Sequence, residues 1–158
     1  MIIYIAFFAI LSTLAVNATI IVMKSFYTLR VNQSINQSAT TALERLSREI
    51  RNAYDFDATQ STFGTSPGRL TLNTKDTGGA NTTMEFYVVG NQLGLKEGGV
   101  DRGALVTKSV TFTNLVFRSI TTANSKAIKI EATIRDSRSA TTQTVKFYDT
   151  IVLRGSAH

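Results

Sequence analysis

Residues 1–23 contain no charged side chain and are mostly apolar. As a helix this segment would be roughly 35 Å long, which is enough to cross the hydrocarbon core of a membrane. An amphipathic helical pattern follows at once, without the glycine or proline that marks a turn. The junction therefore predicts one long helix, soluble in lipid over its first half and packed on a protein domain over its second.

Four polar side chains interrupt the apolar segment. The hydroxyl groups of Ser12, Thr13 and Thr19 can hydrogen-bond to their own helix, so they cost little in lipid. The amide of Asn17 has no such local solution, and an amide at membrane depth usually faces a neighbouring helix. We therefore expect Asn17 to lie at a helix–helix contact; the alternative is a polar residue that lipid tolerates.

A cleaved secretory signal explains this segment poorly. The segment has no basic beginning, its apolar run is too long, and no small-x-small cleavage site follows. Lys24 and Arg30 come just after it and, taken alone, would hold the following part in the cytoplasm. A basic leader removed before Met1 would explain both the missing basic beginning and the position of Lys24 and Arg30. We therefore expect Met1 to be a processed N-terminus.

Aromatic residues flank the end of the apolar segment. Phe26 and Tyr27 stand beside Lys24, at the depth where aromatic side chains favour the membrane interface. Packing between identical helices is the alternative role for these two residues and for Phe7 and Phe8.

Residues 24–54 carry a single apolar stripe. Apolar side chains recur there at intervals of three and four, at Leu29, Ile35, Ala39, Ala42, Leu43, Leu46, Ile50 and Ala53. The opposite side bears the i,i+4 pairs Glu44–Arg48 and Arg45–Glu49. The stripe predicts an amphipathic half-helix, and we assign its packing on a sheet to Ile35, Ala39, Leu43, Leu46 and Ile50.

Residues 55–158 have the alternation of β-strands. A loop is predicted at 58–68, and Gly90–Asn91 is a favourable two-residue hairpin turn. The predicted strands cover 69–72, 83–89, 92–96, 107–120 (with a bulge near Thr113–Asn114), 128–135 and 145–154, with a loop at 136–142. Because one face of this antiparallel sheet needs a cover, the sequence predicts an α+β fold in which the long N-terminal helix packs on a C-terminal antiparallel sheet.

Length and charge narrow the classes of function. About 135 residues follow the apolar segment, enough for one domain. The net charge is +6, but lysine and arginine form no run. A diffuse positive charge is weak evidence for nucleic-acid binding, and we expect none.

No residue pattern indicates catalysis or a cofactor. The chain has no cysteine, so disulfides and thiolate metal sites are excluded, and its only histidine is the final residue, His158. No glycine-rich phosphate loop is present. Asp55 and Asp57 could offer oxygens to calcium, but a turn that uses aspartate–backbone bonds explains them better. We therefore expect neither an enzyme nor a bound cofactor or metal.

Two sequence blocks carry a family resemblance. Residues 42–53 (ALERLSREIRNA) resemble the helix of minor pilins and minor pseudopilins, in which an L-x-R-E-I-R-x-A run recurs. The ending at 150–154 (TIVLR) resembles their last strand. With the predicted layout, which matches over nearly the whole chain, the protein resembles the type IV pilin and pseudopilin family.

The chain departs from that family at its beginning. Family members usually start with Phe and carry Glu at the fifth position, where this chain has Met1 and Ile5. The family Glu is thought to pair with the N-terminal amine of a neighbouring subunit, and some members located at filament tips lack it. The usual helix-softening Gly and Pro are replaced by Leu14 and Val22, so we expect a continuous helix, with 17–19 the candidate for any softening.

The resemblance implies a structural subunit of a type IV pilus. Its apolar helices would bundle as a filament core, and its β-domain would face outward. The implied partners are further copies of the chain, other pilins, an inner-membrane platform, an assembly ATPase and a prepilin peptidase that cleaves before Met1. Pilins carry a methylated N-terminus, so the resemblance also implies methylation of Met1. The chain would be a single-pass membrane protein in lipid before assembly and an extracellular filament afterwards. The residues assigned to the core are Met1, Ile5, Phe8, Leu11, Ala15, Asn17 and Ile20.

Two alternatives remain open at the level of the sequence. One is a minor pseudopilin that initiates or caps the pseudopilus of a type II secretion system, which the absence of the fifth-position Glu favours. The other is a single-pass membrane protein that displays a sensory or adhesive β-domain. That arrangement predicts a flexible linker after the apolar segment, and the sequence has none.

Overall fold

The computed structural model describes residues 1–106, 110–136 and 144–154. The predicted loop at 136–142 and His158 therefore lie almost entirely outside the described residues. The chain divides into two compact units, Met1–Ser34 and Ile35–His158, and each is described by itself. Helix α1, Ile2–Asn52, is continuous over 51 residues and supplies the first unit and the beginning of the second.

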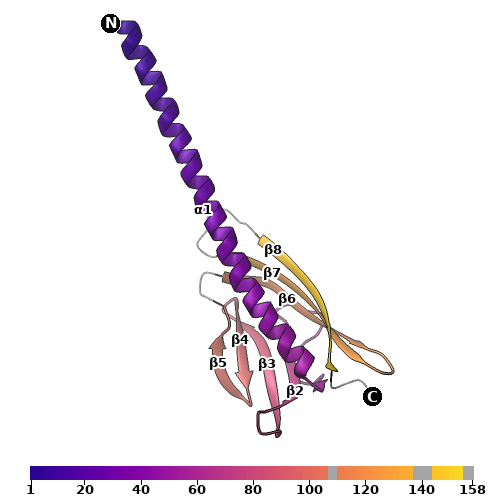
Figure 1. The fold of residues 1–158 in the computed structure, drawn as a ribbon. Coiled ribbons are helices and arrows are strands. Elements are labelled where there is room, and N and C mark those ends of the chain that lie inside the picture. Colours follow the sequence, from indigo (N-terminus) through magenta and orange to yellow (C-terminus); the bar gives the residue numbers. More distant parts are fainter. Residues whose placement is uncertain (107–109, 137–143, 155–158) are drawn as a thin grey trace. The chain divides into compact units, whose positions relative to one another are not determined.

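The first unit is the part of α1 up to Ser34, which contains the apolar segment 1–23 (Figure 1). Its threonine hydroxyls bond to the helix backbone as predicted: Thr13 Oγ1 donates to the carbonyl of Ala9, and Thr19 Oγ1 to that of Ala15, both at 2.9 Å. The helix is unbroken through residues 17–19. It is long and apolar enough to cross a membrane, and none of its apolar window is buried.

The second unit contains the end of α1 and the strands, all antiparallel within their sheets (Figure 1). A five-stranded sheet has the order β1-β2-β3-β4-β5, and a three-stranded sheet has the order β6-β7-β8. The strand bounds are β1 Asp55–Phe56, β2 Leu70–Lys75, β3 Asn81–Val89, β4 Gln92–Glu97, β5 Val100–Ala104, β6 Val110–Thr121, β7 Lys126–Asp136 and β8 Thr144–Val152.

The predicted α+β fold, a long N-terminal helix followed by antiparallel strands, is confirmed, but the strands form two sheets where the sequence predicted one. The sequence did not reveal β5, because all five of its residues are exposed and show no apolar alternation. A tight turn at Gly98–Gly99 folds β5 onto the free edge of β4. β6 pairs with β7 and belongs to the second sheet.

The predicted hairpin and bulge are confirmed. Gly90 and Asn91 have φ values of 58° and 63°, the left-handed conformation that a type I′ turn requires at both central positions. In β6 the register shifts between Phe112 and Asn114, where the change of apolar face indicated a bulge. The two predictions succeeded because both depend on local sequence.

From Ile35 onward the apolar stripe of α1 forms part of the core of the second unit, whereas Leu29, its first predicted member, lies in the first unit and is 56% exposed. Ile35, Ala39, Leu46 and Ile50 are completely buried, whereas Leu43 is only half-buried. The sheets contribute an equally buried set to this core, including Leu70, Leu72, Phe86, Leu93, Phe117, Ile128 and Ile134. Burying each large aliphatic side chain stabilises the fold by about 1.5–3 kcal/mol, so the stripe holds the helix on the sheets.

Substitution at Ile50 tests this core. Ile50→Ala leaves a cavity, so we expect the free energy of unfolding to fall by about 2–5 kcal/mol. The matched control is Ile120→Ala, because Ile120 is 42% exposed on β6; its expected cost is below about 1 kcal/mol. Urea unfolding of the detergent-solubilised full chain, followed by tyrosine fluorescence, measures both. Equal costs would contradict the packing of the stripe.

A glycine on β4 makes room for an aromatic ring on β3. Gly94 lies directly opposite Tyr87, and a Cβ at Gly94 would come within 2.7 Å of the Tyr87 ring. Lys96 Nζ stands 4.8 Å from the centre of the same ring, on its face. The ring therefore fills the space that a side chain at position 94 would take.

Gly94→Ala should destabilise the second unit by about 1–3 kcal/mol, because the ring must move. In a Tyr87→Ala background the same substitution should cost almost nothing, since the ring that it displaces is gone. Thermal unfolding of the two single variants and the double variant measures the coupling. Simple additivity of the two effects would show that the close approach does not matter.

Candidate interaction surfaces

The residues predicted for the filament core are all exposed in the single chain. Met1, Ile5, Phe8 and Ala15 follow the spacing of one helix face, whereas Asn17 and Ile20 lie on the other side. Phe8, for example, is 71% exposed. A helix that is apolar on every side and uncovered by its own chain needs lipid or other helices around it. The first candidate surface is therefore the whole circumference of α1 between residues 1 and 23.

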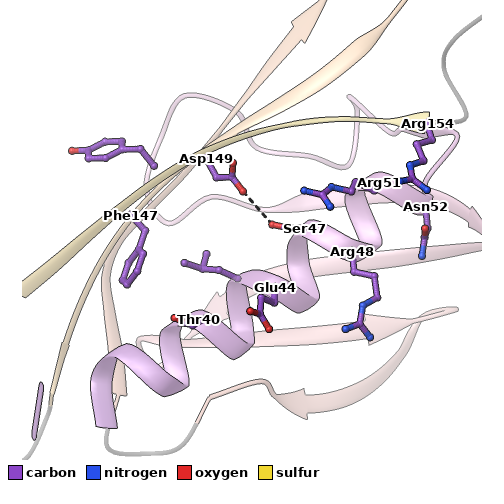
Figure 2. A pocket seen from close by; sticks show the side chains of 11 residues that line it. Thr40, Glu44, Ser47, Arg48, Arg51, Asn52, Phe147, Asp149 and Arg154 are labelled. Carbon is purple, nitrogen blue, oxygen red and sulfur yellow. Dashed lines mark hydrogen bonds between the residues drawn. The ribbon is translucent and has the colours of Figure 1, made fainter. Parts of the chain in front are cut away.

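The second surface is a groove in the second unit, between α1 and β8 (Figure 2). Its volume is about 640 Å³, and we call it the α1–β8 groove. Ser47 Oγ donates a hydrogen bond to Asp149 Oδ2 across it, at 3.3 Å. The residues that line it are Thr40, Leu43, Glu44, Ser47, Arg48, Arg51, Asn52, Phe147, Tyr148, Asp149 and Arg154.

One core-facing position of β8 at this groove is a carboxylate. The core-facing positions of the strand end in Ile151 and Leu153, which are buried. Asp149 and Phe147 belong to the same set of alternate positions. Asp149 is nevertheless exposed, and Phe147 is only half-buried. An aspartate cannot be packed under the helix without losing its water, so helix and strand stay apart there. The sequence prediction passed over Asp149; an acidic residue in a core-facing series was the signal.

One end of the α1–β8 groove is basic. Arg48 and Arg51 come from the last turns of α1, where cations favour the helix dipole, and Arg154 comes from the chain just after β8. Within the described residues none of the three forms an ion pair. An adjoining hollow of about 470 Å³ shares Arg51 and Arg154 and adds Lys75. Positive charge therefore accumulates there beyond what Glu44 and Asp149 can balance.

The other end of the groove is apolar. Leu43 of α1 and Phe147 of β8 are both half-buried and line it. This explains why Leu43 differs from the other members of the predicted packing set. The groove thus offers an apolar contact at one end and a cationic contact at the other.

Of the two predicted i,i+4 ion pairs, one forms. Arg45 Nε lies 2.6 Å from Glu49 Oε1, which leaves Glu49 engaged on the far side of the helix from the groove arginines. Glu44 and Arg48 both line the groove and do not pair with each other in the described part of the chain.

The two aspartates of the D-x-D sequence have separate local roles. The Asp57 carboxylate accepts hydrogen bonds from Thr59 Oγ1 at 2.6 Å and from the backbone N–H groups of Thr59 and Gln60, which lowers its pKa. Asp55 binds Lys126 Nζ through both oxygens, at 2.7 and 2.8 Å. The described residues contain no cluster of three potential metal ligands. Asp57 therefore forms the predicted kind of turn, whereas Asp55 stands in β1 and pairs with the distant Lys126.

No family model matches this chain, and neither does any curated protein or solved structure. The architecture itself is pilin-like: a long apolar N-terminal helix is followed by antiparallel sheets.

The groove arginines should matter little for folding. Arg51→Gln and Arg154→Gln should each change the free energy of unfolding by less than about 0.5 kcal/mol, because both side chains are exposed and unpaired among the described residues. Lys126→Gln should cost about 1 kcal/mol, since it breaks the two-oxygen contact with Asp55. Urea unfolding compares the three variants. A loss above 2 kcal/mol for either arginine would assign it a structural role.

Proposed function

We propose that this protein is a structural subunit of a type IV pilus. Its N-terminal helices would bundle in the filament core with the β-domain exposed outward. The observation that carries the proposal is α1 itself: an apolar, fully exposed segment continues without a break into a stripe buried in the second unit. A simple membrane anchor does not need this continuity, whereas a subunit that carries its domain into a filament does.

The energetics of the apolar segment suit such an assembly. Exposing the segment to water is costly, at about 25 cal/mol per Å² of apolar surface, so a bundled filament does not release subunits into solution. Transfer from lipid into a bundle of similar helices changes the apolar environment little. A machine that spends ATP can therefore drive assembly from the membrane and allow return to it.

The N-terminal sequence favours a second candidate within the same family. No acidic residue lies in the first turn of α1, and the first carboxylate along the chain is Glu44. A subunit that initiates or caps a filament, such as a minor pseudopilin of a type II secretion system, does not need to pair its fifth residue with a preceding subunit. The absence of a carboxylate at Ile5 is the feature that favours a tip subunit over a shaft subunit in this proposal.

Electron microscopy of sheared cell-surface material tests the proposal. Filaments should bind antibodies raised against the β-domain, and deletion of the chain should remove them. Ala15→Trp places a bulky side chain among packed helices but remains compatible with lipid, so we expect at least a tenfold loss of filaments at an unchanged amount of membrane-bound protein. Tyr27→Trp is the control, because it keeps an aromatic ring near the interface.

The labelling pattern separates the remaining candidates. Antibody along the whole shaft indicates a major subunit, and antibody only at filament ends indicates the initiating or capping role. Protein found only as a detergent-soluble monomer, with no filament lost on deletion, would overturn the proposal in favour of a membrane protein that displays a sensory or adhesive β-domain.

A further inference from the structure

Strand β5 presents a second unpartnered surface on the same unit as the α1–β8 groove. It is the last strand of the five-stranded sheet, so within the part of the chain that the structure describes one row of its backbone groups has no neighbouring strand. All five of its residues are exposed. β5 and β8 lie toward opposite sides of the unit (Figure 1). A copy of the chain therefore offers two different surfaces at two separate edges.

The chemistry of β5 complements the groove. Val100 is 58% exposed, and Asp101 follows it directly. Gly103 N–H donates to Asp101 Oδ1 at 2.8 Å, and this bond together with the Tyr87 hydroxyl lowers the pKa of the Asp101 carboxyl. Asp101 is therefore ionised at neutral pH, yet no ion pair involves it in the described residues, whereas Arg102 is held by Glu97 at 3.1 Å.

We propose that β5 of one copy docks in the α1–β8 groove of a second copy, with Asp101 against Arg51 and Val100 against Phe147. Successive side chains of a strand point to opposite sides. In an inserted β5, Asp101 and Val100 therefore point to opposite sides, and we place the carboxylate toward Arg51 of α1 and the apolar side chain toward Phe147 of β8. Figure 2 shows Arg51 extending along the groove toward Asp149, where an incoming carboxylate can reach it.

This contact is heterologous, because it joins two different surfaces of the chain. A surface that binds a different surface on the next copy produces a ring or a helical chain of subunits, whereas a surface that binds itself stops at a dimer. The inference rests on the proposed function in one respect: a pilus brings copies of the β-domain together in such a series. The proposed contact goes further, because it names the residues through which neighbouring β-domains touch.

Disulfide cross-linking tests the contact cleanly, because the natural chain has no cysteine. The full chain carrying Val100→Cys and Phe147→Cys is expressed in its own cells in place of the natural chain and treated with a copper–phenanthroline oxidant. Non-reducing gels should show a ladder of dimers, trimers and larger species. Either cysteine alone should give no species beyond a dimer. The matched control replaces Val100→Cys by Val89→Cys, which is similarly exposed but lies at the end of β3.

Charge reversal tests the polar half. Asp101→Arg and Arg51→Asp, each added to the cysteine pair, should lower the ladder yield at least fivefold, and both together should restore at least half of it. Thermal unfolding checks that each variant folds. An equal ladder from the Val89→Cys control, a product that stops at dimers, or loss without rescue in the double reversal would overturn the contact.

Electron microscopy of the same samples separates the two proposals. Filaments without a ladder would refute the β5–groove contact and leave the pilus assignment intact. A ladder without filaments would support the contact and refute the pilus assignment. Absence of both would refute both.

Discussion

Burial of one side of a helix is the interaction on which the second unit depends. Ile35, Ala39, Leu46 and Ile50 lose all contact with solvent, and without them the inner faces of both sheets would be uncovered. The small side chains of Ala39 and Ala42 are buried and allow the helix to approach the sheets closely. The polar stretch at 32–41 has poor helix propensity, so this burial also explains why it is helical at all.

Most of the fold could be predicted from the sequence, because its signals are local. The uncharged segment, the three-and-four stripe, the Gly90–Asn91 turn and the β6 bulge each depend on neighbouring residues, and each is present in the structure. β5 could not be found in this way. It pairs with β4 through its backbone while exposing every side chain, so no apolar pattern marks it. The sequence prediction therefore missed β5, and it also missed the division into two sheets.

The two candidate surfaces differ in the same respect. The exposed apolar part of α1 is evident from composition, because an uncharged segment of this length has few alternatives. The α1–β8 groove arises from residues about a hundred positions apart, such as Ser47 and Asp149, and depends on one acidic residue in a core-facing series. A single sequence shows that irregularity but not what lies across from it. In the sequence, Arg48 and Arg51 could be recognised only as residues of the helix, and Arg154 only as the end of the last strand.

The threonine hydrogen bonds of α1 have a mechanical consequence. At Thr13, Thr19, Thr28 and Thr41 a side-chain hydroxyl shares the carbonyl four residues earlier with the helical N–H. Such sharing weakens the backbone bond slightly and concentrates curvature at that turn. The first half of α1 contains neither glycine nor proline. Its threonines nevertheless give the helix several points at which it can bend slightly, so that it can adapt to neighbouring molecules while it stays helical throughout.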